Sequence, residues 1–191
     1  MRTVTRVAFI LTWLACSAAA PTADWSTLGL GGQGRHCSSR ESGCQAVAST
    51  RYGAVHVTTT LTGTFRLTVG DKLIRNFEGE AFTIEGSFAP VGSDNLLLSV
   101  ASGGMACPME LYILRLAAGA APVLSRRFGT CSDLYRAKVE EGTLVIEEPV
   151  YFDPSLYEEG NEAQRKERAR GPDTIVYRWF GSQLTEQPAP Q

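Results

Sequence analysis

Cysteines carry the most reactive side-chain chemistry in this sequence. Beyond the N-terminal segment they are Cys37, Cys44, Cys107 and Cys131. An even number of cysteines predicts disulfides if the chain is exported, as its N-terminus indicates below, although four cysteines allow three pairings. Proximity in the sequence favours Cys37–Cys44 and Cys107–Cys131. Metal binding is the competing interpretation, helped by His36, but structural zinc sites use cysteine or histidine pairs two to four residues apart, a spacing absent here. We therefore expect disulfides and no metal.

Ser132 and Asp133 directly follow Cys131 and invite comparison with a catalytic serine. Such a serine needs a base, most often histidine, which a third group orients. The two histidines are His36 and His56, and His56 lies in an alternating run typical of a strand surface. Asp133 fits better as an acceptor of backbone hydrogen bonds in a turn. We predict no catalytic residue in this block.

Carboxylate pairs offer a second route to catalysis, because glycoside hydrolysis uses two of them. The sequence supplies three neighbouring pairs, which are Glu78 with Glu80, Glu140 with Glu141, and Glu147 with Glu148. Most lie at expected turns or on alternating strand faces, where solvated charge is the ordinary expectation. A small cell-wall or carbohydrate hydrolase that uses such a pair is the enzymatic alternative.

Aromatic residues and arginines gather around a mixed-charge insert at residues 153–172. This composition is typical of side chains that anchor protein interfaces. The competing interpretation is that the first aromatic residues complete the core at the end of a strand. The predicted partner-binding residues are Tyr151, Phe152, Tyr157, Arg165, Arg168 and Arg170.

A glycine-rich stretch at residues 29–34 matches the dinucleotide-binding pattern G-x-G-x-x-G. That pattern works only after a strand and at the start of a helix, where backbone amides hold a pyrophosphate. Here no helical periodicity follows it. We interpret the stretch as a flexible loop and expect no cofactor.

The elements that must position these residues are strands. From residue 52 onward, apolar and polar residues alternate with period two between glycine-rich turns. Gly70 and Asp71 predict one tight hairpin. Roughly eight to ten short strands favour an all-β fold, an antiparallel sandwich, barrel or propeller-like sheet. The expected strands span 52–60, 64–69, 72–77, 81–88, 95–100, 110–116, 123–128, 134–139, 143–147 and 174–180.

The N-terminus has the features of an export signal. Two arginines precede an apolar run and a group of small residues, which predicts a signal peptide over residues 1–19. The run is too short to cross a bilayer as a helix. Lipid attachment at Cys16 is the less favoured alternative, because Trp13 and Leu14 fit the acylation pattern poorly. We predict a periplasmic or secreted protein with no transmembrane segment.

The two cysteine-centred blocks also carry a resemblance. The segments Gly-Gly-x-Ala-Cys-Pro, around Cys107, and Phe-Gly-Thr-Cys-Ser-Asp, around Cys131, resemble those of a group of exported β-rich proteins of Gram-negative bacteria. The resemblance covers residues 96–139. It implies a shared β-fold and a shared disulfide, and no activity.

These observations predict the domain organisation and a class of function. We expect a glycine- and serine-rich, loop-dominated arm with a local disulfide over 20–50, one all-β domain over 51–186 that carries the insert at 153–172, and a disordered tail over 187–191. With 20 acidic and 18 basic residues, the chain shows no preference for nucleic acid. The favoured function is a non-catalytic module that binds another envelope protein, such as an inhibitor or immunity protein of an envelope enzyme. A passive structural part of an envelope complex is the remaining alternative.

Overall fold

The computed structural model describes residues 36–103, 109–132, 135–150 and 173–189. Thirteen strands in these ranges form three antiparallel sheets, which confirms the predicted all-β class. Every sheet has two end strands, so none closes into a barrel. No helix in the described ranges has the length and apolarity to cross a bilayer. The predicted signal peptide and the insert at 153–172 lie outside these ranges.

The N-terminal sheet is a meander of four consecutive strands. They are β2 (Gln45–Thr50), β3 (Gly53–Thr59), β4 (Phe65–Val69) and β5 (Lys72–Phe77). Phe65 and Leu67 are fully buried, whereas Arg66 between them is exposed, as the alternation predicts. Gly70 adopts a φ of +54° in the predicted hairpin, a conformation that favours glycine.

The middle sheet contains the next meander and one added strand. Its order is β1, β6, β7, β8, β9. Their bounds are β1 (His36–Ser38), β6 (Ala81–Phe88), β7 (Ser93–Ala101), β8 (Met109–Ala117) and β9 (Val123–Leu124). The Cys37–Cys44 disulfide joins β1 to the residue before β2, with the two Cα atoms 5.6 Å apart, and confirms the predicted pairing.

The C-terminal sheet is the third meander. It comprises β10 (Arg136–Glu140), β11 (Thr143–Pro149), β12 (Thr174–Phe180) and β13 (Gln183–Pro188). The predicted hairpin between β10 and β11 turns at Glu141 and Gly142, which both have positive φ. On β12, Tyr177 and Trp179 are buried on one side, as the alternation predicts.

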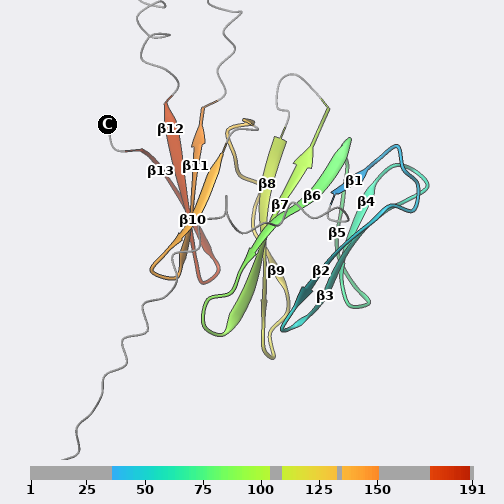
Figure 1. Ribbon diagram of the computed structural model, residues 1–191, viewed down its shortest axis with the longest axis horizontal. Coiled ribbons are helices and arrows are strands. Elements are labelled where there is room, and N and C mark those ends of the chain that lie inside the picture. Colours follow the sequence, from blue (N-terminus) through green and yellow to red (C-terminus); the bar gives the residue numbers. More distant parts are fainter. Residues whose placement is uncertain (1–35, 104–108, 133–134, 151–172, 190–191) are drawn as a thin grey trace, which may run out of the picture.

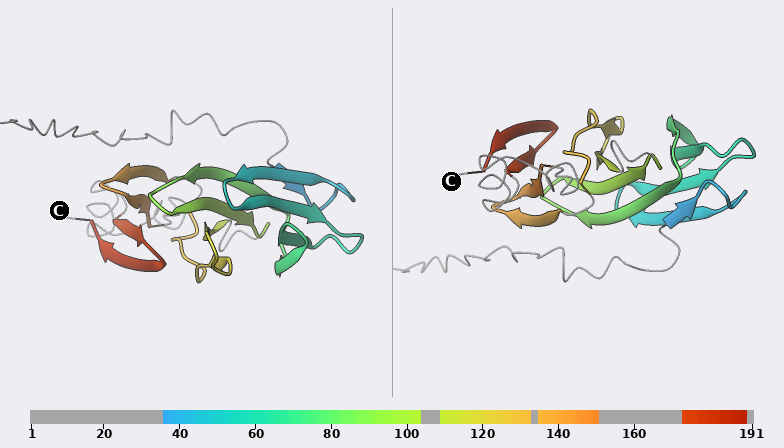
Figure 2. Two further views of the ribbon diagram at one scale, coloured as in Figure 1. Left: turned by 90° about the horizontal axis from the view of Figure 1, so that it is seen from below. Right: turned by 90° about the horizontal axis from the view of Figure 1, so that it is seen from above.

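The three sheets stack as layers, with the middle sheet between the other two (Figure 1). The last strand of each meander lies on the same side of the stack, so β5, β9 and β13 are at corresponding edges (Figure 2). The layers therefore follow one another in the order of the chain, an arrangement that no sequence repeat reveals.

Two hydrophobic clusters fill the two gaps between layers, and β7 contributes to both. Leu96, Leu98 and Val100 belong to the cluster shared with the N-terminal sheet, whereas Leu97 belongs to the cluster shared with the C-terminal sheet. A strand covered on both faces needs apolar residues at consecutive positions. The leucine-rich run at 95–100 is therefore the central strand of the molecule, as its composition indicates.

Three sequence expectations need correction. Within the arm predicted over 20–50, β1 and β2 are strands; Ala46 and Ala48 point inward on β2, too small to give a strong alternation. The strand predicted over 123–128 keeps regular pairing only at β9, followed by an isolated bridge between Leu111 and Phe128. At the C-terminus, β13 was not predicted, and it continues to Pro188, beyond the start of the predicted disordered tail.

Candidate functional site

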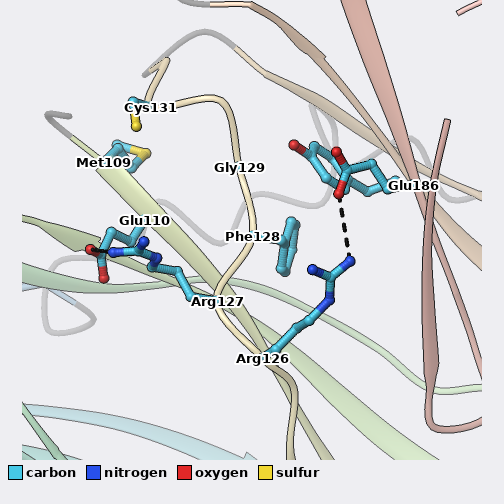
Figure 3. Close-up of a pocket in the computed structure, with 9 residues that line it drawn as sticks. Met109, Glu110, Arg126, Arg127, Phe128, Gly129, Cys131 and Glu186 are labelled. Atoms are coloured by element: carbon cyan, nitrogen blue, oxygen red, sulfur yellow. Dashed lines mark hydrogen bonds and ion pairs between the residues drawn. The ribbon is translucent and has the colours of Figure 1, made fainter. Parts of the chain in front are cut away.

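A pocket of about 220 Å³ lies between the middle and C-terminal sheets (Figure 3). Its residues come from the start of β8, the segment that follows β9, and strands β12 and β13. They are Met109, Glu110, Arg126, Arg127, Phe128, Gly129, Cys131, Tyr177 and Glu186. The volume is below the roughly 300–1,000 Å³ of sites for drug-sized ligands, so it suits a single side chain.

Ser125 shapes the segment that carries the two arginines. Its hydroxyl accepts a hydrogen bond from the backbone N–H of Ile113 at 2.9 Å and donates one to the carbonyl of Arg126 at 2.8 Å. The Ser125 hydroxyl thus replaces a backbone carbonyl as the acceptor of the Ile113 N–H in the hydrogen-bond ladder between the strands. This insertion ends β9 and explains why the predicted strand does not continue regularly to residue 128.

Aromatic rings form the inner wall of the pocket. The ring centroids of Phe128 and Tyr177 are 5.0 Å apart, with their planes tilted by 52°. Burial, more than the nearby carboxylate of Glu148, raises the pKa of Tyr177 to about 12, so the phenol is neutral at physiological pH. The two rings therefore add an aromatic surface to a pocket whose exposed lining is mostly polar.

Two ion pairs stand on either side of Phe128 (Figure 3). Arg127 contacts Oε1 of Glu110 at 2.8 Å, and the other oxygen of this carboxylate accepts the hydroxyl of Tyr112 at 2.8 Å. Arg126 approaches Glu186 only to 3.5 Å. Both arginine side chains are about two-thirds exposed, at 64% and 66%, so each pair contributes little stability and is open to exchange with a partner's charges.

The loop at residues 129–132 closes the pocket on one side. Gly129 has a φ of +112°, and a Cβ atom there would approach Oε2 of Glu148 to 3.3 Å. Cys131 has a φ of +71° and is disulfide-bonded. Its predicted partner, Cys107, lies outside the described residues, so that pairing stays a prediction. The Thr130 hydroxyl also donates a hydrogen bond to the carbonyl of Pro149.

Glu148 supports this loop from behind and is fully buried. The backbone N–H of Ser132 donates a hydrogen bond to its Oε1 at 3.2 Å. Burial raises the pKa of Glu148 above its usual range, an effect that the nearby N–H groups of Thr130 and Ser132 partly oppose. The direction of this pKa shift follows from the cost of a buried charge, which burial imposes on the ionised carboxylate.

The structure separates the residues considered for serine catalysis. Ser132 contacts Glu148 of the C-terminal sheet. His56 lies on β3 of the N-terminal sheet, between the buried Val55 and Val57, and so faces outward. The whole middle sheet lies between them (Figure 1). His36 lies on β1 and contacts the hydroxyl of Thr83 at 3.0 Å.

The carboxylate pairs are also dispersed. Glu147 and Glu148 are on opposite faces of β11, because Glu148 is buried while Glu147 contacts Lys138 at 2.9 Å. Glu140 contacts the same lysine at 3.0 Å, and its neighbour Glu141 forms the turn. The remaining candidates, residues 78 and 80, are exposed in the connection between β5 and β6.

Sequence reasoning placed the partner-binding surface elsewhere. The six residues predicted for it, Tyr151, Phe152, Tyr157, Arg165, Arg168 and Arg170, lie outside the described residues. The two consecutive arginines before Phe128 could have indicated the pocket from the sequence, because arginines next to an aromatic residue are typical of interfaces. The buried position of Glu148 also follows from alternation, since it shares a strand face with Leu144 and Ile146. Nothing in the sequence pattern brings Glu186 to Arg126.

No protein-family model, curated protein or solved structure matches this chain.

Proposed function

We propose that this chain is a non-catalytic binding protein of the bacterial envelope, which receives one side chain of a protein partner in the pocket beside Phe128. The observation that carries the proposal is a small, mostly polar pocket in which two exposed arginine–glutamate pairs flank the ring of Phe128. We propose an envelope enzyme as the partner, which this protein would inhibit or protect against.

Size and composition support a protein ligand. The most strongly binding residues of protein interfaces are anchors that fill well-packed pockets surrounded by polar side chains. Methionine, aromatic residues and arginine are enriched at such interfaces. The pocket combines Met109, Phe128 and Tyr177 with the two arginines, and its volume of about 220 Å³ suits one inserted side chain.

The charges of the pocket support binding over catalysis. Each lining carboxylate, Glu110 and Glu186, forms an ion pair with an arginine. Neither histidine of the described residues lines the pocket. The mixed charges instead suit recognition, because complementary pairs orient a partner and exclude others.

An envelope location rests on two features. The N-terminal residues have the pattern of an export signal. The Cys37–Cys44 disulfide is of the kind that persists in oxidising compartments such as the periplasm. Both features are also consistent with secretion from the cell.

The test begins with an affinity pull-down from an envelope extract of the source organism, using the oxidised protein as bait. The affinity of the purified partner is then measured by calorimetry for the wild type and for the Arg126→Glu, Arg127→Glu double variant. Arg66→Glu, an exposed change on the N-terminal sheet, is the matched control.

We expect the double variant to bind at least about tenfold more weakly and the control to bind like the wild type. Circular dichroism establishes that both variants are folded. Unchanged affinity of the double variant for a stoichiometric partner would contradict the role of the pocket. The absence of any partner, together with turnover of a cell-wall substrate, would replace binding with hydrolysis.

A further inference from the structure

The edge of β13 is self-complementary, and we infer that it pairs with β13 of a second copy to form a symmetric dimer. This inference is independent of the proposed function. It rests on three observations: the weak protection of this edge, the direction of its backbone groups, and the side chains that a two-fold axis brings opposite each other.

Edge strands that avoid pairing carry charges, bulges or other devices that block an added strand. In β10, three of the five residues are charged, with both signs present. The pairing of β4 with β5 is interrupted by a register shift, and β5 carries Lys72 and Arg75. The strands β1 and β9 are only three and two residues long.

The remaining edges are β2 and β13. A disulfide holds β1 beside the start of β2, and the two strands lie against each other. In contrast, β13 is six residues long, and Glu186 is its single charged residue. It is also almost entirely exposed and forms the end of its sheet (Figure 1). It is the least protected edge among the described strands.

The register with β12 shows which backbone groups of β13 face outward. The N–H of Ala189 donates to the carbonyl of Thr174 at 2.8 Å, so residues 189 and 174 form a hydrogen-bonded pair. The pairing continues without a shift to Phe180 and Gln183. Since hydrogen-bonded pairs alternate, the N–H and C=O groups of Leu184 and Glu186 point away from β12.

A two-fold axis through Thr185 satisfies these groups in both copies. Leu184 of one copy then lies opposite Glu186 of the other, and the two residues exchange backbone hydrogen bonds in both halves of the interface. Thr185 lies opposite its own copy in the closer, non-hydrogen-bonded type of pair. Pro188, which has no N–H to donate, falls beyond this pairing.

The side chains fit the same register. On the outer face, Thr185 meets Thr185, and Gln183 meets Gln187, which are pairs that form hydrogen bonds or are neutral. On the inner face each Glu186 lies opposite a leucine, so no two like charges are directly opposed. Each Glu186 also keeps Arg126 of its own chain as a partner.

The dimer would join the two C-terminal sheets into one continuous sheet and place two pockets on either side of the axis, because Glu186 lines the pocket. Its affinity should be low, because two strands of six residues bury much less than the roughly 1,600 Å² of a standard stable interface. A closed two-fold contact also stops at the dimer, whereas pairing of β13 with β10 would continue into filaments.

The test is sedimentation equilibrium of the oxidised protein at concentrations up to about millimolar, the range of weak association. Thr185→Lys and Thr185→Glu are measured separately and as an equimolar mixture. Thr185 is exposed and outside the pocket, so neither change should disturb folding. Asn76→Lys, an exposed change on the edge strand β5, is the control for added charge.

We expect the wild type and the control to dimerise equally, and each Thr185 variant to dimerise about fivefold more weakly through like-charge repulsion at the axis. The mixture should regain at least the wild-type affinity, because lysine then faces glutamate. This rescue also shows that the variants are folded. A monomeric wild type, a dimer insensitive to Thr185, or assemblies larger than a dimer would each overturn the inference.

Discussion

Asp94 and Asn95 are adjacent on β7, yet their side chains tie the middle sheet to opposite neighbours. Asp94 accepts the backbone N–H of Arg51 at 2.6 Å and its guanidinium Nε at 2.8 Å, from the turn between β2 and β3. Asn95 accepts the indole N–H of Trp179 on β12 at 2.9 Å. The alternation of side chains along a strand therefore lets two consecutive polar residues connect all three layers.

Replacement of Asp94 should loosen the contact between the N-terminal and middle sheets. Asp94→Asn removes the charge that faces Arg51 and keeps the shape, and we expect a loss of about 1–3 kcal/mol in the free energy of unfolding. Chemical denaturation measures this loss. Asp71→Asn, at an exposed hairpin turn, is the control and should change stability by less than about 0.5 kcal/mol. Equal effects at both positions would contradict the role of Asp94.

Replacement of Asn95 tests the link to the C-terminal sheet. Asn95→Ala leaves the buried N–H of Trp179 without its acceptor, which should cost about 1–3 kcal/mol. In a Trp179→Phe background the donor is absent, so the same change should cost less. A double-mutant cycle from denaturation curves measures the difference. If Asn95→Ala costs the same in both backgrounds, the hydrogen bond does not stabilise the interface between these layers.

Glu148 should make stability depend on pH. Its pKa is raised in the folded protein, so the folded state binds the proton more tightly than the unfolded chain. Its contribution to stability is therefore complete below the ordinary glutamate pKa and is lost as the pH rises through the raised pKa. Glu148→Gln imitates the neutral carboxyl. As the pH rises through the raised pKa, this variant should become progressively more stable than the wild type.

Denaturation curves of both proteins between pH 4 and pH 8, at about unit intervals, test this expectation. The difference between the two proteins isolates Glu148 from the other titrating groups. A difference that is constant across the pH range would show that Glu148 has the same pKa in the folded and unfolded states.

Ser125 should be needed to hold the arginine segment in place. Ser125→Ala removes the acceptor of the buried Ile113 N–H, and we expect a cost of about 1–3 kcal/mol. Hydrogen exchange should show reduced protection of the Ile113 amide, while protection in β3 of the N-terminal sheet stays unchanged. Unaltered protection at Ile113 would mean that another group replaces the hydroxyl.

Most strands could be predicted from the sequence, because the alternation of apolar and polar residues depends only on neighbouring positions. Period-two alternation predicted β3 to β8, β10, β11 and β12, and the leucine-rich run predicted a central strand. The signal failed where the inward residues are small, as in β2, and where a strand is polar, as in β13. It also failed at Ser125, where the predicted strand ends early. A side-chain hydroxyl that bonds to the neighbouring strand does not change the pattern of apolar and polar residues.

The sequence by itself indicated most of the strands and their buried faces and favoured the local Cys37–Cys44 disulfide, because each depends on residues close together in the chain. The tertiary structure alone decided the stacking of the layers and the composition of the pocket. Arg126 meets Glu186 and Phe128 meets Tyr177 only after sheets formed by distant segments pack together. Such contacts follow from the packing of whole sheets, which no local pattern of residues specifies.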